Sequence, residues 1–343
     1  MPRRPGQEPG HAPGRPARGP SRDTHGLSWA DYIDDLVGRR GTLAAVALHM
    51  AERRGFSEDV ESVERGLRRL RGRGSQSGGV WGQRALSCFG LPSEVDARIR
   101  WMGQYHSRFT DLPASIGEEL LRPWDRPPVS DSPARIWVLL GWVGLGLRQR
   151  EDVSGLLEQA ALLAGRAELA AQVELLLVHS FAWGRVDPSA SAQALSRAGA
   201  LLQSSSAESM PAEDRACLFA RWIDQCAYSL NKPAKGPPDH AAAVELYERI
   251  DPQGPLFARC RRENGLGWSH LKLGDTAAAE AHARASVEAA GDRGSLRLRA
   301  MALKLLAAAT EGETSRRAIS RARAIARDLE DLALTKRLRP RTG

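Results

Sequence analysis

The chain has 343 residues, which is too many for a single compact hydrophobic core of ordinary size. We therefore expect two domains or one elongated repeat array. With 42% hydrophobic and 26% charged residues its composition is globular, and its most apolar run, residues 136–147, is too short for the roughly 20 residues that span a bilayer. The net charge of +8 comes almost wholly from arginine and favours acidic partners, although GC-rich codons alone would produce the same excess of arginine.

The first 26 residues are rich in proline, glycine and arginine. No apolar run follows their positive charge, so they lack the pattern of a secretory signal. A segment of this composition cannot bury enough surface to offset the entropy that ordering it would cost. We therefore predict a disordered tail over residues 1–26.

Residues 27–122 predict a small domain of short helices. Ser28 and Ser57 are candidate N-caps, each placed directly before a helical pattern, and Pro92 ends a further short helix. Proline is frequent over residues 123–133, which we interpret as a linker between two domains.

Part of this domain, residues 42–70, resembles a repressor-type helix-turn-helix, in which Glu64-Arg65-Gly66 would follow the recognition helix. The resemblance implies a transcriptional regulator with a repeat domain as sensor. It places five arginines near DNA phosphates: Arg65, Arg68, Arg69, Arg71 and Arg73. The candidate recognition helix is acidic, however, and offers no cluster of side chains for reading base edges. We therefore keep DNA binding as the alternative and favour a helical cap or partner-docking domain.

Residues 134–335 predict a series of helix pairs. Apolar residues at intervals of three and four mark the helices, and turn signals divide them into pairs over 134–164, 167–204, 211–250, 254–290 and 295–330. The pairs start about 33 to 44 residues apart, which is typical of helical repeats. Stacked pairs form a curved solenoid, so we predict an all-α fold in which a small N-terminal helical domain precedes an α-solenoid of about five helix pairs. The basic residues 336–343 would form a tail.

The segment 264–291 carries the clearest repeat signal. It resembles a tetratricopeptide repeat at four positions, namely Leu266, Gly267, Gly274 and Ala279. Glycine at 274 can end the first helix in the left-handed conformation, and Asp275 can cap the second. Gly267 lets the two helices approach closely where it faces Ala279. The resemblance implies hairpins whose first helices line a concave surface for a protein or peptide.

On this interpretation the partner-binding side chains belong to the first helix of each pair. The candidates are Arg135, Trp142, His179, Trp183, Arg221, Asp224, Asn264, Trp268 and Lys272. We expect a protein or peptide ligand and a regulatory or scaffolding role. Nucleic acid is the partner only under the helix-turn-helix alternative.

No enzymatic motif is present. The sequence has no phosphate-binding loop, no zinc-peptidase motif and no nucleophile elbow, so we expect no catalytic residue, cofactor or metal. His270 and His282 lie on adjacent predicted helices and can approach each other, but two histidines alone make a poor metal site. The four cysteines lack a C-x-x-C spacing and are predicted to be buried free thiols, which suits a reducing cytoplasm.

Overall fold

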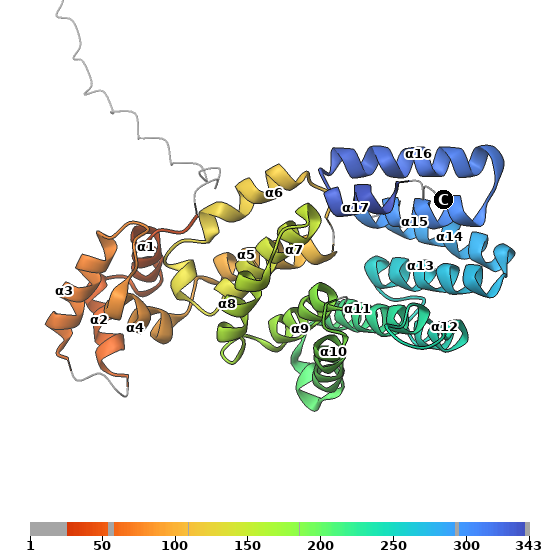
Figure 1. Cartoon of the computed structure of the whole chain (residues 1–343). Helices are drawn as coiled ribbons and strands as arrows, with labels where there is room; N and C mark the ends of the chain where they lie inside the picture. Colours follow the sequence, from red (N-terminus) through yellow and green to blue (C-terminus); the bar gives the residue numbers. More distant parts are fainter. Residues whose placement is uncertain (1–25, 54–57, 109, 185, 292–294, 340–343) are drawn as a thin grey trace, which may run out of the picture.

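A computed structural model of the chain describes residues 26–53, 58–108, 110–184, 186–291 and 295–339. Over these ranges all regular structure is helical, with seventeen α-helices, three short 3-10 helices and no strand (Figure 1). The predicted fold class, a small N-terminal helical unit followed by an α-solenoid, is confirmed. The tail predicted over 1–26 lies outside the described residues, apart from Gly26.

The N-terminal unit has a core of its own. It consists of α1 (Trp29–Arg40), α2 (Leu43–Ala51), α3 (Val60–Arg71) and α4 (Gly79–Phe89). Ser28 caps α1 as predicted, with its hydroxyl accepting the backbone N–H of Asp31 at 3.2 Å. Trp29 is fully buried, and its indole N–H donates to the carbonyl of Gln76 at 2.9 Å. The predicted cap Ser57 lies outside the described residues, and Asp59 caps α3 instead.

The second core begins earlier than predicted. The helices α5 (Ser93–Arg108) and α6 (Ala114–Leu121) pack on the repeat region, and the expected linker folds into two 3-10 helices, η1 (Arg122–Trp124) and η2 (Val129–Asp131). Trp124 and Val129 are buried in the same core as Ile99 of α5. Leu27 and Leu91 pack against both this core and the core of the N-terminal unit. Prolines alone suggested a linker, but the buried Trp and Val anchor this segment.

Five helix hairpins follow and stack side by side. They are α7 (Arg135–Gln149) with α8 (Ser154–Ala164), α9 (Leu169–Trp183) with α10 (Pro188–Gln203), α11 (Ala212–Asn231) with α12 (His240–Glu248), α13 (Leu256–Leu273) with α14 (Thr276–Gly291), and α15 (Leu296–Ala309) with α16 (Gly312–Asp328). The short η3 (Ser205–Ser209) precedes α11, and α17 (Leu332–Arg337) comes last. Each first helix contacts the next first helix, so the pairs form a continuous array.

The turn chemistry that the sequence indicated is present. Gly274 ends α13 in the left-handed conformation with φ of 87°, and the Asp275 carboxylate accepts the N–H of Ala278 at 2.9 Å. A side chain at Gly267 would come within 2.6 Å of Leu305 and 3.3 Å of the Ala279 carbonyl. Glycine at 267 is therefore needed for close packing of α13 against its neighbours.

The array returns to its start, which the sequence did not predict. The helix α17 packs against α7, and Figure 1 shows it beside α6 and α7. The carbonyl of Leu329 accepts hydrogen bonds from the backbone N–H of Ala114 at 3.2 Å and from Nη2 of Arg148 at 2.6 Å. Asp331 is fully buried and accepts from Nε of Arg297 at 2.7 Å. The last hairpin is thus fastened to the first, and the array closes on itself.

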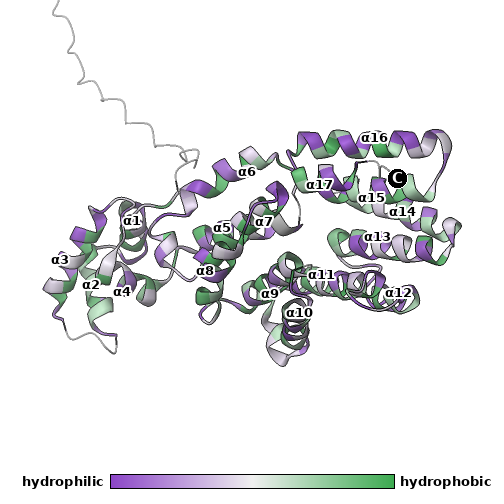
Figure 2. Cartoon of the chain, in the orientation of Figure 1, coloured by the Kyte–Doolittle hydropathy of each residue, from purple (hydrophilic) through white to green (hydrophobic). Residues whose placement is uncertain are grey.

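The C-terminal surface is hydrophilic, as a last repeat requires. Figure 2 shows mostly hydrophilic residues along α16, where only the alanines at 318, 322 and 326 are buried. The predicted basic tail over 336–343 begins inside α17, since this helix ends only at Arg337. The next residue, Leu338, is buried in a core that includes residues of α16. Residues 340–343 lie outside the described part. No described helix has the length and apolar character needed to cross a membrane.

Candidate binding surface and pocket

All nine predicted partner-binding residues lie on first helices of the hairpins. Two of them hold neighbouring helices together. Arg221 of α11 is buried and ion-paired with Glu174 of α9, which is itself fully buried. Asp224 accepts from the Tyr247 hydroxyl at 2.9 Å and from Nη1 of Arg261 at 2.6 Å. Because their charges are matched within the protein, these two side chains stabilise the stack instead of facing a partner.

The α7 candidates are also engaged in packing. Nε of Arg135 donates to Asp125 at 3.1 Å, and its Nη2 donates to Gln159 at 3.3 Å. Trp142 is half-buried, and its indole N–H is buried with no hydrogen-bond partner among the described residues. Most buried polar groups in proteins are hydrogen-bonded. The indole N–H of Trp142 is thus an unmatched donor on the first hairpin.

Three candidates share one face of α13. Asn264, Trp268 and Lys272 are spaced four residues apart, so they follow each other along the helix surface. Asn264 is half-buried, and its side-chain N–H group lacks a hydrogen-bond partner in the described part of the chain. The ammonium of Lys304 lies 5.6 Å from the Trp268 ring centre, and Lys272 is exposed. The N–H group of Asn264 is itself buried, so what this face presents is an aromatic surface and two positive charges.

The remaining candidates lie near the end of α9. The rings of His179 and Trp183 are 6.0 Å apart. Burial lowers the pKa of His179, while the Asp187 carboxylate opposes that shift. The neutral form of His179 is therefore favoured, and its ring is tilted by 34° to that of Trp183.

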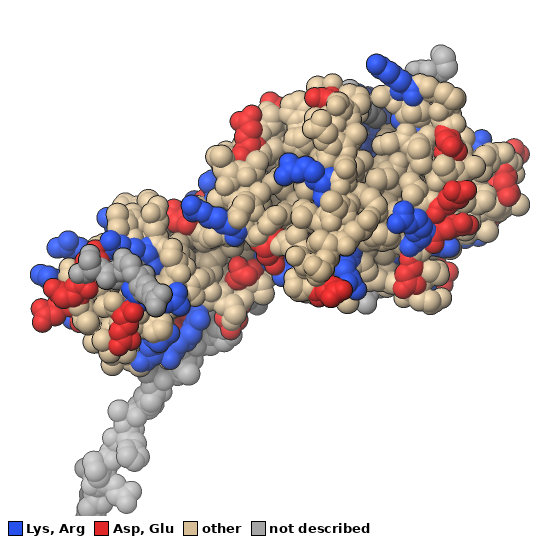
Figure 3. Space-filling model, turned by 90° about the horizontal axis from the view of Figure 1, so that it is seen from below, with Lys and Arg blue, Asp and Glu red and all other residues tan. Residues whose placement is uncertain are grey.

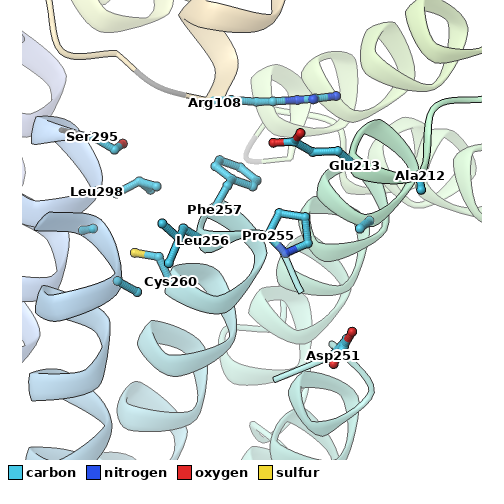
Figure 4. Close-up of a pocket in the computed structure, with 13 residues that line it drawn as sticks. Arg108, Ala212, Glu213, Asp251, Pro255, Leu256, Phe257, Cys260, Ser295 and Leu298 are labelled. Atoms are coloured by element: carbon cyan, nitrogen blue, oxygen red, sulfur yellow. The ribbon is translucent and has the colours of Figure 1, made fainter. Parts of the chain in front are cut away.

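A pocket opens at one edge of the array. Its volume is about 490 Å³, and Figure 4 shows side chains from several elements around it. First helices of stacked hairpins run parallel, so their N-terminal ends meet at the same edge. The wall contains residues from the first turns of α11, α13 and α15 and from the ends of α5 and α14. They include Arg108, Glu213, Phe257, Cys260, Ala289 and Leu298.

Arg108 was not among the predicted residues and is the most unusual side chain of the pocket. It is 4% exposed, and its Nη1 donates to Asp214 at 2.7 Å. Nε and Nη2 of Arg108 have no hydrogen-bond partner in the described ranges. Arg100 and Gln104 also contact Asp214, at 2.6 and 3.3 Å. Burial raises the pKa of Asp214, but the charges and hydrogen bonds of Arg108 and Arg100 outweigh it, so this pKa lies below its ordinary value.

A sequence signal for this cluster exists. Arg100, Gln104 and Arg108 follow each other at intervals of four, which places them on one face of α5. Three polar side chains in that pattern indicate a shared polar partner. The partner, Asp214, is more than a hundred residues away, and no local pattern identifies it.

The histidines and cysteines do not form a metal site among the described residues. The rings of His270 and His282 stack at 5.4 Å, so the predicted approach occurs, and Nδ1 of His282 lies 2.7 Å from Glu263. All four cysteines are free, as predicted; Cys88, Cys217 and Cys260 are also buried as predicted, whereas Cys226 is only half-buried. Burial raises the pKa of Cys217 to about 11, so its thiol is protonated at neutral pH.

The N-terminal unit departs from a helix-turn-helix. The helix α2 ends at Ala51 and α3 begins at Val60, and residues 54–57 between them lie outside the described part. Gly66 lies inside α3 instead of after a recognition helix, and a side chain there would come within 2.4 Å of the Trp81 ring. Glycine at this position is therefore a packing requirement.

The five arginines proposed to contact DNA are all exposed. Three of them have partners within the unit: Arg68 pairs with Glu64 at 2.5 Å, Arg71 pairs with Asp34 at 2.7 Å, and Arg73 donates to the Ser77 carbonyl at 2.6 Å. On the face seen in Figure 3, basic and acidic side chains are interspersed, without a continuous basic stripe among the residues shown. Mixed charge of this kind binds a phosphate backbone weakly.

Comparison of the chain with models of protein families, with curated proteins and with solved structures gives no match. The chain's own residues and contacts are therefore the basis for its proposed function.

Proposed function

We propose that this chain is a non-enzymatic helical-repeat protein that binds a protein or peptide segment and acts as a regulator or scaffold. The observation that supports this most is the face of α13 formed by Asn264, Trp268 and Lys272. There the aromatic ring of Trp268 and the exposed ammonium of Lys272 follow one another on a first helix of the array, beside the buried amide of Asn264.

An extended peptide suits this face chemically. Trp268 offers apolar area for a peptide side chain. Lys272 and Lys304 favour an acidic residue beside it. The aromatic pair of His179 and Trp183 adds a second contact surface on α9.

The test uses the full chain as bait and compares the proteins that it captures with those captured by variants. Asn264→Ala combined with Trp268→Ala should reduce capture of the partner by about tenfold or more, since hot-spot truncations cost about 2 kcal/mol each. Arg316→Ala combined with Arg317→Ala is the matched control, because both arginines lie exposed on the outer helix α16. Equal capture by the α13 variant and the wild type would overturn the proposal.

A further inference from the structure

The helix α17 lies between the two ends of the array. It packs against α7 of the first hairpin and α16 of the last, and Figure 1 shows it directly below α16. It also reaches α9, where the guanidinium of Arg337 lies 5.8 Å from the centre of the Phe181 ring. This short helix therefore contacts three hairpins, as a segment bound from another chain would.

Two leucines hold this segment on the array. Leu334 and Leu338 are almost fully buried, in a core that also contains Leu303 of α15 and Ala322 of α16. Side chains four residues apart lie on the same side of a helix. The carbonyl of Leu338 also accepts a hydrogen bond from Nε of Arg323 at 3.0 Å. The two leucines are thus the apolar anchors of an amphipathic helix, the kind of segment that helix-binding surfaces recognise.

The helix α17 can open without opening the array. Its other side faces solvent, since Leu332 is 54% exposed and Lys336 and Arg337 are exposed as well. Isolated helices shorter than about 12 residues are marginal in water, and segments with few buried side chains open most easily. Asp331 is fully buried and ion-paired with Arg297, so an opening that begins after Asp331 leaves the closure in place.

We propose that the surface under α17 binds a helix of a partner protein, and that α17 covers this surface until the partner helix replaces it. The partner helix has two leucines four residues apart and a basic residue directly before the second, as α17 has in Leu334, Arg337 and Leu338. Its leucines take the places of Leu334 and Leu338, and its basic residue lies over the ring of Phe181. The inference rests on the proposed function, because it assumes a partner protein, but it concerns a surface other than the face of α13.

The experiment uses a fluorescent, N-acetylated peptide that copies residues 331–339, and measures its binding to the full chain by fluorescence anisotropy. In Leu334→Ala combined with Leu338→Ala, α17 loses its two anchors while the surface beneath it is unchanged. This double variant should bind the peptide about tenfold or more tighter than the wild type, in which α17 competes from within the same chain. Leu332→Ala is the matched control, because Leu332 belongs to the same helix but is exposed. It should bind the peptide as the wild type does.

Two further measurements locate the peptide and test the opening of α17. Phe181→Ala, added to the double variant, should weaken peptide binding by about twofold to fivefold, because it removes the ring under the basic residue. In the wild type, the backbone amides of Thr335 and Leu338, which are hydrogen-bonded within this segment, should exchange hydrogen about tenfold or more faster than amides in the middle of α9 and α15. Hydrogen exchange needs no variant, so it decides the inference even where the double variant folds poorly.

Equal hydrogen exchange in α17, α9 and α15 would overturn the inference, because α17 would then open only when the whole array unfolds. A peptide that binds neither the wild type nor a folded double variant would overturn it as well. A peptide that binds both proteins equally, with binding lost in Trp268→Ala, would overturn the surface under α17 while supporting the proposed face of α13. Tight binding by the double variant alone, together with equal partner capture by the α13 variant, would support this inference and overturn only the face of α13.

Discussion

Replacing Asp331 by alanine should destabilise the whole chain, because this carboxylate closes the array. Asp331 is fully buried and accepts from Nε of Arg297 at 2.7 Å and from the N–H of Leu334 at 2.7 Å. Its carboxylate also lies 3.7 Å from Nε of Arg148, which is itself buried. Alanine at 331 would leave the Arg148 and Arg297 guanidinium groups without their anion and remove the N-cap of α17.

The expected loss is large relative to the stability of an ordinary protein. Breaking a buried ion pair by removing one partner costs about 3–5 kcal/mol, and loss of an N-cap costs about 1 kcal/mol. We therefore expect the free energy of unfolding to fall by roughly 4–6 kcal/mol, out of a typical 5–15 kcal/mol. Urea denaturation followed by circular dichroism measures this change, and small-angle scattering reports whether the array opens.

The control for this variant is Glu313→Ala. Glu313 forms exposed ion pairs with Arg316 and Arg317 on α16, and such pairs contribute about 0–1 kcal/mol. A loss of less than about 1 kcal/mol in Asp331→Ala, similar to this control, would refute the view that the buried ion pairs close the array.

Three further predictions concern packing, pH and thiol reactivity. Gly66→Ala brings a methyl group within 2.4 Å of the Trp81 ring and should lower the free energy of unfolding by about 1–3 kcal/mol in urea titrations; an unchanged midpoint would contradict the packing role. The folded-state pKa of Asp214 is lowered, so its contribution is present above its ordinary pKa of 3.8 and is lost as pH falls below that value. Asp214→Asn should therefore flatten the decline of stability with falling pH in acid, and an identical pH profile would contradict this. Cys217 is buried with its pKa raised to about 11, so iodoacetamide at pH near 8 should label it far more slowly in native protein than in urea, as peptide mass spectrometry would show; equal rates would contradict its burial.

The elements of the fold could be predicted because their signals are local. Asp187 followed by Pro188 is a local start signal for α10, and the Asp187 carboxylate accepts the N–H of Ser189 at 3.0 Å. Gly274 likewise marked the end of α13. A cap or a left-handed turn depends on a few neighbouring residues, so the sequence pattern contains it.

The closure of the array could not be predicted in this way. Arg148 and Leu329 are 181 residues apart in the chain, and nothing in the helical period relates them. The packed segment around Trp124 was mistaken for a linker for a similar reason, since its prolines are visible in the sequence but its burial depends on α7.

The candidate site was only partly predictable. The hairpin pattern placed Arg221 and Asp224 on first helices, but it does not distinguish a face that contacts the next helix from a face open to a partner. Both side chains form ion pairs or hydrogen bonds between helices. Arg108 was missed because its pocket is assembled from five separate helices, although its spacing from Arg100 and Gln104 was visible.

Crosslinking mass spectrometry between the full chain and a captured partner tests the peptide-binding assignment most directly. A photoreactive residue introduced at Lys272, which is exposed on α13, should form crosslinks to the partner. The same residue introduced at Arg317 on the outer helix α16, or at Arg69 in the N-terminal unit, should form none. Crosslinks confined to Arg317 or Arg69 would contradict partner binding by the first helices.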